Sequence, residues 1–383
     1  MKMSICGLIA EYNPLHNGHV WQIQQIKRNL QPEVLVVVMS GNFVQRGDFA
    51  ILNKWQRARL ALEAGADLII ELPIYGAVQP ADIFAEEAVR ILQQLQVETL
   101  VFGSENPHID YYQLAEQIQK VSLNSEQFTD FHNTYATQFN QNLQQQLGIN
   151  ITQPNQLLGL AYAQACLKLN YPVRLLPLAR KGQIAHNAVS LQGKYSSASA
   201  IRRALFAGSA YQNAVPQFTQ AALAQADLYN WEDFFKFLKY RLLTVSLSEL
   251  GQIYQMNEGL EYKLRQEILA AQNFTDFLHR IKSKRYTYAR LRRLCMYTLL
   301  NISVTQMQQM RRQRYLHVLG FNMAGQKHLH NIKKNLELPL ITKVTQKLGN
   351  GTGLMAPTVM ADRIFNLVNV PEQNFGRQPI KRK

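Results

Sequence analysis

The most informative part of the chain reads Gly7-Leu8-Ile9-Ala10-Glu11-Tyr12-Asn13-Pro14-Leu15-His16-Asn17-Gly18-His19. The apolar run 4–10 has the length of a buried strand, and residues 18–30 repeat apolar side chains with the period of a helix. In an open parallel sheet, ligands bind beyond the carboxyl ends of the strands, where a helix N-terminus offers free N–H groups to a phosphate. The sequence therefore predicts a phosphate site at the junction of the first strand and the first helix.

Two histidines at this junction are the candidate catalytic groups. His16 and His19 are three positions apart, so both lie near one face of the opening helical turn. Two imidazoles can donate hydrogen bonds to the charge that develops during attack on the α-phosphate of ATP, and Gly18 leaves room for phosphate oxygens at the backbone. The alternative is that the pair only caps the helix or fills the core. The context of strand, loop, glycine and helix favours the phosphate site.

The front of the chain alternates between strand and helix patterns. Strands rich in Val, Ile and Leu are expected at 33–39, 67–72, 98–102 and 172–176, and helices at 53–64, 81–95, 156–169 and 197–207. Strands that are apolar at every position favour a parallel sheet covered on both faces. From residue 227 onward strand signals fade and amphipathic helical patterns take over. We predict an α/β fold, with a Rossmann-like parallel-sheet domain over 1–210 and a mainly α-helical C-terminal domain over 225–383.

Charge divides the chain in the same way. The net charge is +15, and residues 281–383 hold nineteen Lys and Arg against three Asp and Glu. The remaining 280 residues are therefore close to neutral. A basic excess of this density favours a polyanion as partner, and only for the back of the chain.

Composition also excludes several classes of protein. No apolar run approaches the roughly 20 residues that span a bilayer, and the N-terminal run lacks the cleavage site of a secretory signal. We therefore expect a cytoplasmic protein without a membrane partner. Cys6, Cys166 and Cys295 are far apart in sequence, which indicates neither a zinc site nor a disulfide framework. No ligand spacing for a protein-held metal is present.

Several motifs in order resemble one known family. They are Glu11-Tyr12-Asn13-Pro14-Leu15-His16-Asn17-Gly18-His19, Met39-Ser40-Gly41-Asn42-Phe43-Val44-Gln45-Arg46-Gly47, Gly65-Ala66-Asp67 through Glu71-Leu72-Pro73, and Phe102-Gly103-Ser104-Glu105. The order of strand, loop and His-x-Gly-His resembles the signature of the nucleotidylyl-transferase superfamily. Taken together, the four motifs resemble the tRNA(Met) cytidine acetate ligase family. The similarity covers most of the chain and is densest up to about residue 203. Leu15 stands where the family often has Phe.

The resemblance implies a two-step reaction. Acetate attacks the α-phosphate of ATP, which arrives with Mg²⁺, to give acetyl-adenylate and pyrophosphate. The acetyl group then passes to the exocyclic amine of the wobble cytidine of elongator tRNA(Met), and the product is N4-acetylcytidine. The front domain would then be a nucleotidylyl-transferase domain.

The resemblance also implies the site residues. Ser197-Ala198-Ser199-Ala200-Ile201-Arg202 is similar to the superfamily's second signature, with Ser199 where Thr is common, and its Arg202 would pair with departing pyrophosphate. His16, His19 and Arg202 are thus the implied catalytic residues. The implied ATP-binding residues are Ile9, Ala10, Glu11, Tyr12, Asn13, Pro14, Leu15, His16, Asn17, Gly18, His19, Val20, Trp21, Gln22, Gly103, Asn155 and Arg180.

Other polar residues near the strand ends are open to two interpretations. Arg46 follows the second strand and either clamps the acetate carboxylate or a phosphate, or pairs with Asp48 at the surface. Glu71 either orients a ligand or caps the following turn. We expect cations at exposed positions of the next helix, where they are solvated or face tRNA: Lys54, Arg57 and Arg59.

The back of the chain mixes cations with aromatic rings, as phosphate neutralisation and base stacking require. Tyr286 and Tyr288 lie within this stretch. The aromatic residues favour RNA over a membrane surface. The residues predicted to bind RNA are Lys282, Lys284, Arg285, Arg290, Arg292 and Arg293.

Two other functions fit part of the sequence. A coenzyme adenylyltransferase would use the histidine pair but leave the basic region without a role. A catalytically silent RNA-binding protein would use the basic region alone. The residue that binds acetate, the route of the cytidine, the choice of tRNA and the oligomeric state do not follow from the sequence.

Overall fold

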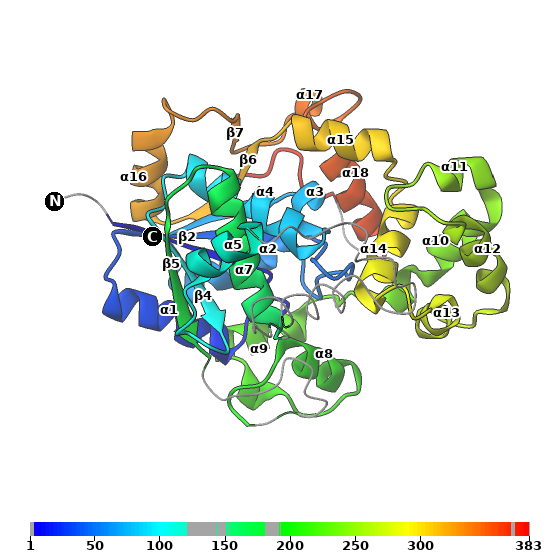
Figure 1. Cartoon of the computed structure of the whole chain (residues 1–383), viewed down its shortest axis with the longest axis horizontal. Helices are drawn as coiled ribbons and strands as arrows, with labels where there is room; N and C mark the ends of the chain where they lie inside the picture. The colour runs from blue at the N-terminus through cyan, green and yellow to red at the C-terminus, as the bar shows by residue number, and fades with distance from the viewer. Residues whose placement is uncertain are drawn as a thin grey trace.

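The computed structural model describes residues 4–120, 144, 151, 153–180, 191, 193–368 and 372–382. Its centre is one sheet with the strand order β5-β4-β1-β2-β3-β6-β7, and β8 also pairs with β6 (Figure 1). The five front strands are parallel and run over Ile5–Ala10 (β1), Val34–Ser40 (β2), Leu68–Leu72 (β3), Thr99–Ser104 (β4) and Arg174–Ala179 (β5).

Side chains alternate between two hydrophobic cores across the central strands. In β2, Val36 and Val38 belong to the core beneath helices α4 and α7, whereas Leu35 and Val37 belong to the core beneath α1 and α2. Every residue of β2 and β3 is buried. This two-faced burial explains why these strands read as continuous apolar runs.

The chain reverses direction across the sheet between β1 and β4. Strands β1, β2 and β3 are added in one direction, and β4 and β5 then extend the sheet from the other side of β1. Such a reversal leaves a crevice at the carboxyl ends of the two strands beside it. The segment after β1 and the end of β4 therefore face the same crevice.

Helices cover both faces of this sheet. The front helices are α1 (Asn17–Asn29), α2 (Lys54–Glu63), α3 (Ile74–Ala77), α4 (Ala81–Gln94), α5 (Tyr111–Lys120), α7 (Pro154–Lys168), α8 (Ala198–Phe206) and α9 (Gln217–Gln225). Asn53 caps α2 by accepting hydrogen bonds from the N–H groups of Trp55 and Gln56, so the helix begins where an asparagine at the N-cap predicts.

Most of the rest of the chain is helical. Its helices are α10 (Trp231–Thr244), α11 (Leu247–Gly251), α12 (Leu260–Ala270), α13 (Phe274–Ile281), α14 (Tyr288–Leu299), α15 (Val304–Arg312), α16 (Met323–Ile332), α17 (Gln346–Gly349) and α18 (Ala356–Phe365). Figure 1 shows α10, α11, α12 and α13 gathered in a lobe, with α14 between this lobe and the sheet. Within the described residues, no helix is both long and apolar enough to span a bilayer.

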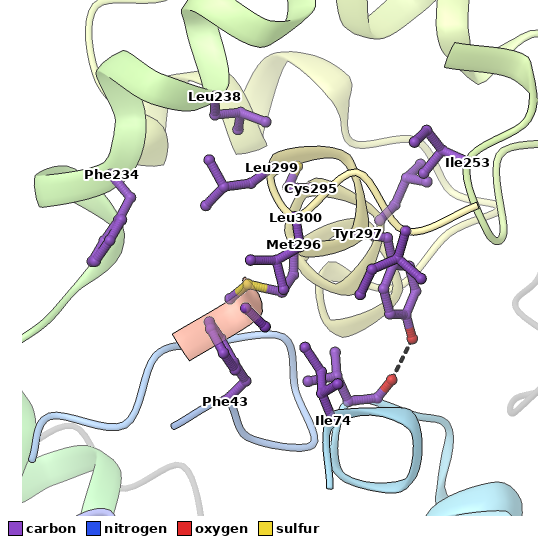
Figure 2. Packing of buried hydrophobic residues seen from close by; sticks show 14 of the residues in the cluster. Phe43, Ile74, Phe234, Leu238, Ile253, Cys295, Met296, Tyr297, Leu299 and Leu300 are labelled. Atoms are coloured by element: carbon purple, nitrogen blue, oxygen red, sulfur yellow. Dashed lines mark hydrogen bonds between the residues drawn. The ribbon is translucent and has the colours of Figure 1, made fainter. Parts of the chain in front are cut away.

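The core of the helical region continues into the front of the chain. Phe43 and Ile74 share one cluster of buried side chains with Leu238 and Met296, and Figure 2 shows the first two on one side of α14 and Leu238 on the other. The Tyr297 hydroxyl donates a hydrogen bond to the carbonyl of Val78. The helical region therefore packs directly on the loop after β2 and on α3, which follows β3.

The predicted fold class is confirmed, but strands were missed after residue 227. β6 (Leu316–Phe321) pairs antiparallel with β3, and β7 (Leu340–Ile341) and β8 (Ile380–Lys381) pair with β6. All six residues of β6 are buried, so the strand lacks the polar alternation that marks a half-exposed strand. The back segment adds these strands to the front sheet. The division into domains at 1–210 and 225–383 stays a prediction.

A buried ion cluster joins α2, β3 and α18. Lys54 Nζ lies 3.0 Å from both carboxylate oxygens of Glu71 and 2.7 Å from Asp362 Oδ2, and His317 Nδ1 of β6 contacts Glu71 Oε2. The expectation that Lys54 is exposed is wrong, because its ammonium group is enclosed between the buried carboxylates of Glu71 and Asp362. Glu71 is an internal ion-pair partner. Burial alone would raise its pKa, but the charge of Lys54 and the hydrogen bond with His317 outweigh burial and lower the pKa.

Replacing Lys54 with Met should lower the free energy of unfolding by about 3 kcal/mol or more, because two buried carboxylates lose their counter-ion. Urea denaturation measures the change. The matched control is Arg59→Met on the same helix, where the side chain is exposed and the expected change is within about 0.5 kcal/mol. Equal losses for the two variants would contradict the structural role of Lys54.

Candidate active site

A cavity of about 630 Å³ opens at the carboxyl ends of β1, β4 and β5. The segment after β1, the start of α1, and parts of α7 and α8 form most of its wall. The loop after β2 also lines the cavity, and Thr287, Ala289 and Arg293 reach it from the helical region. The cavity occupies the crevice that the strand order predicts, and residues from both regions of the chain face it.

The two histidines form a reciprocal capping box at the start of α1. His16 is the N-cap residue, and its Nδ1 accepts a hydrogen bond of 3.1 Å from the N–H of Gly18. His19 Nδ1 in turn accepts one of 3.3 Å from the N–H of His16. The rings stack with centroids 3.7 Å apart and planes inclined by 20°. Capping and phosphate binding are therefore compatible, since capping fixes the orientation of both rings in the cavity wall.

This geometry assigns the ring protons. Both Nδ1 atoms accept hydrogen bonds, so a neutral ring carries its proton on Nε2. Burial lowers the pKa of His19 well below its usual value, and nearby His16 and Arg180 lower it further. His19 is therefore a neutral donor that offers Nε2–H. A neutral donor can bind phosphate oxygens without the cost of burying an imidazolium.

Arg57 fixes the backbone beside these histidines. Its guanidinium is fully buried and donates to the carbonyls of Leu52 at 2.9 Å, Glu11 at 2.7 Å and Ser40 at 2.9 Å, and also to that of Gly41. The expectation of an exposed Arg57 is wrong, because its guanidinium is drawn into the interior by these four main-chain carbonyls. Burial lowers its pKa to about 10, so the side chain stays charged near neutral pH.

The second predicted signature lies across the cavity. Arg202 Nη1 donates to the carbonyl of Asn13 at 2.7 Å, and Nη2 lies 3.4 Å from Ser199 Oγ. Ser197 caps α8 by accepting a hydrogen bond of 3.2 Å from the N–H of Ala200. Ser197, Ser199 and Arg202 all line the cavity. The fold thus brings Arg202 to the loop that carries the histidines.

Gly103, Asn155 and Arg180 line the other flank of the cavity. Glu105 Oε1 accepts a hydrogen bond of 2.5 Å from Asn155 Nδ2 and lies 3.2 Å from Arg180 Nη1. A Cβ on Gly103 would lie 3.4 Å from Arg180 Cγ, an ordinary contact distance, so the arginine side chain runs alongside this glycine. Glu105 belongs to the motif Phe102-Gly103-Ser104-Glu105, and no role was predicted for it. It fixes the two side chains predicted to contact ATP.

Only some residues of the segment 9–22 line the cavity. Ile9, Ala10, Glu11, Tyr12, Asn13, His16, Gly18, His19, Trp21 and Gln22 line it, whereas Pro14, Leu15, Asn17 and Val20 do not. Leu15 is fully buried in the core beneath α1 and α2. Asn17 Nδ2 donates to the carbonyls of Lys194 at 3.0 Å and Asn213 at 2.8 Å. The predicted contacts of these four residues with ATP stay predictions.

The loop after β2 joins the cavity to α14. Arg46 lines the cavity, and Asp48 forms its ion pair with Arg292 at 3.6 Å. Arg293 is buried and donates to the carbonyl of Gln45 at 3.3 Å. Gly47 has φ of +77°, and a Cβ there would lie 2.3 Å from the backbone nitrogen of Arg293. The loop and the helix are thus in direct backbone contact.

The other predicted RNA-binding residues surround the start of α14. Lys284 is exposed, Arg285 pairs with Glu258 at 2.6 Å, and Arg290 lies 4.4 Å from the centre of the Tyr286 ring. Lys282 lies over the ring of Tyr288. Arg293 differs from this set because it faces the cavity. Within the described part of the chain, no group of His, Cys, Asp and Glu side chains could hold a metal ion.

Comparisons with known proteins agree with this geometry. The model of the family described as HIGH Nucleotidyl Transferase matches residues 3–378. A protein named tRNA(Met) cytidine acetate ligase from Latilactobacillus sakei is 48% identical over 382 residues, which is 99% of this chain and 97% of that protein. The chain belongs to the tRNA(Met) cytidine acetate ligase family. A relative of the same name from Lactobacillus gasseri is 45% identical over all of both chains.

Solved structures of this family have the same fold. The chain is 25% identical to apo TmcAL of Thermotoga maritima, with a TM-score of 0.86 and 99% of each chain covered. A second structure of that protein, bound with alpha-thio ATP, has a TM-score of 0.85 at the same identity and coverage. The family and fold that the sequence motifs predict are confirmed. The roles of individual site residues stay predictions.

We expect the His19 ring to remain neutral from about pH 6 to 8. The pKa of His19 is lowered in the folded protein, so the ring would be protonated only at a pH well below the usual pKa of histidine. Proton NMR of the ring Cε1–H across this range measures it, with His19→Gln identifying the resonance. A resonance that titrates near pH 6.5 would contradict the assignment of a neutral donor.

Proposed function

We propose that this chain ligates acetate to the wobble cytidine of elongator tRNA(Met) at the expense of ATP, through an acetyl-adenylate. The stacked His16 and His19 at the sheet's reversal point carry the proposal. Family membership supports it, because the relatives bear the name of this activity. We place the reaction in the cytoplasm, where tRNA and ATP are found together.

The first step joins acetate to AMP. The acetate carboxylate attacks the α-phosphate of ATP, which arrives with Mg²⁺, and pyrophosphate leaves. The Nε2–H groups of His16 and His19 would donate to the phosphate oxygens as charge develops on them. Arg202 would pair with pyrophosphate as it departs, and Arg180 and Asn155 would hold the nucleoside side of ATP. Arg46 is our candidate for the acetate carboxylate.

The second step delivers the acetyl group to RNA. The N4 amine of the cytidine attacks the acetyl carbonyl, and AMP leaves. The cationic and aromatic side chains around the start of α14 adjoin residues of the cavity wall, such as Thr287 and Ala289. An RNA strand held there could place one base in the cavity. This arrangement favours the ligase over a coenzyme adenylyltransferase, for which the basic region would have no role.

The direct test measures both half reactions with the purified chain. Acetate-dependent exchange of pyrophosphate into ATP should occur without tRNA, and acetylation of tRNA(Met) should need all three substrates. We expect His19→Ala to lower the exchange rate at least about a hundredfold, since it removes a donor to the developing charge. Absence of both activities in the folded wild-type chain would refute the proposal. A silent RNA-binding protein would bind tRNA equally well with and without His19.

Replacing Lys282, Lys284, Arg285 and Arg290 together with Gln should weaken tRNA binding and reduce its salt dependence. The slope of log affinity against log salt concentration should fall by roughly three to four, because each of the four lost phosphate contacts releases about 0.7 to 0.9 counter-ion. Filter binding across salt concentrations measures it. A control with the same charge change replaces four exposed lysines elsewhere, Lys333, Lys334, Lys343 and Lys347. Equal effects of the two variants would show that only net charge matters.

A further inference from the structure

A carboxylate lies in the cavity where phosphates are expected. Glu11 directly follows β1 and lines the cavity together with His16, His19 and Arg202. A carboxylate repels phosphate groups, so contacts with the phosphates alone give no reason for an acid at this position. The second step of the proposed reaction does need one, because an amine that becomes an amide must lose a proton.

The structure holds this carboxylate in one orientation. Glu11 Oε1 accepts a hydrogen bond of 2.8 Å from the N–H of Gln45, and the Glu11 carbonyl is held by Arg57 at 2.7 Å. The carbonyl of Gln45 accepts from Arg293 of α14 at 3.3 Å. Within the described residues, Oε2 accepts no hydrogen bond from the chain. One carboxylate oxygen is therefore fixed, and the other is available to a ligand.

The position of Glu11 fits the meeting point of the two substrates. On one side lie the histidine pair and Arg202, which we assign to the phosphates. On the other lies the loop of Gln45 and Arg46, which packs against α14 and so leads towards the basic surface. The acyl group of the adenylate and the incoming base must meet between these two sides.

We propose that the Glu11 carboxylate accepts the proton that the cytidine N4 amine loses when it attacks the acetyl-adenylate, an inference that rests on the proposed function. The C–N bond forms as the amine nitrogen adds to the acetyl carbonyl. The bond between the carbonyl carbon and the phosphate oxygen breaks, and its electron pair leaves with AMP. One N4 proton moves to Glu11 Oε2 and then to water, which restores the carboxylate.

The electrostatic surroundings suit a proton acceptor. Burial raises the pKa of Glu11 above its usual value, while the Gln45 N–H and the guanidinium groups of Arg202, Arg46 and Arg57 oppose this shift. Tyr162 of α7 also lines the cavity near Glu11. Burial raises the pKa of its phenol, and the Glu11 carboxylate raises this pKa further. The phenol of Tyr162 therefore stays neutral. A carboxylate whose pKa is moved towards neutrality is a stronger base than an exposed one.

The test separates the two half reactions in Glu11→Gln, which keeps the shape of the side chain but cannot take up the proton. Single-turnover transfer of acetyl from the enzyme-bound adenylate to tRNA(Met) should fall at least about a hundredfold. Acetate-dependent pyrophosphate exchange should fall less than about tenfold. In the wild type, transfer should speed up as the pH rises through the Glu11 pKa and then level off, and the variant should lack this rise.

A matched control is Glu105→Gln, which removes the same charge from the flank that holds Asn155 and Arg180. It should raise the KM for ATP, while the pH dependence of transfer stays that of the wild type. Glu11→Asp, which keeps an acid, should retain the pH-dependent rise. Equal losses of exchange and transfer in Glu11→Gln would assign the residue to ATP or Mg²⁺ binding and overturn the inference. A normal rate of acetyl transfer in Glu11→Gln would also overturn it. Absence of both activities in the wild type would instead refute the proposed function.

Discussion

A buried guanidinium holds the catalytic end of the sheet together. Arg57 binds four main-chain carbonyls that come from the ends of β1 and β2 and from the turn before α2. Parallel strands leave these carbonyls without partners once the ladder stops, and an unpaired buried carbonyl is costly. One five-donor side chain satisfies them together. The loop with the histidines and the loop with Gln45 are thereby fixed relative to each other, and the cavity lies between them.

The ion cluster around Lys54 extends the same principle to the helical region. Asp362 of α18 and His317 of β6 reach the cluster from the back of the chain. The front of the sheet and the helices that pack on it thus share charges that no water screens. Together with the hydrogen bond from Tyr297 to the carbonyl of Val78, this makes the helical region part of the cavity's support.

Sequence patterns predicted the parallel sheet and its phosphate site because these depend on local order. An apolar run, a glycine and a helix start within 19 residues are enough to place His16 and His19. The patterns failed for Lys54 and Arg57, because a charged side chain early in a helix usually faces solvent. A signal was present in the apolar neighbours Trp55, Ala58 and Leu60, which leave little of α2 for solvent. β6 was missed because its partner β3 lies about 250 residues earlier.

The close approach at Gly47 limits how such enzymes can diverge. Its backbone touches that of α14 with no space for a methyl group, and its carbonyl accepts a hydrogen bond of 2.8 Å from the Trp231 indole. The helical region therefore cannot be exchanged between relatives as an independent module, because α10 and α14 both contact Gly47 of the loop after β2. Chimeras between members of the family would have to transfer the loop and these helices as a unit.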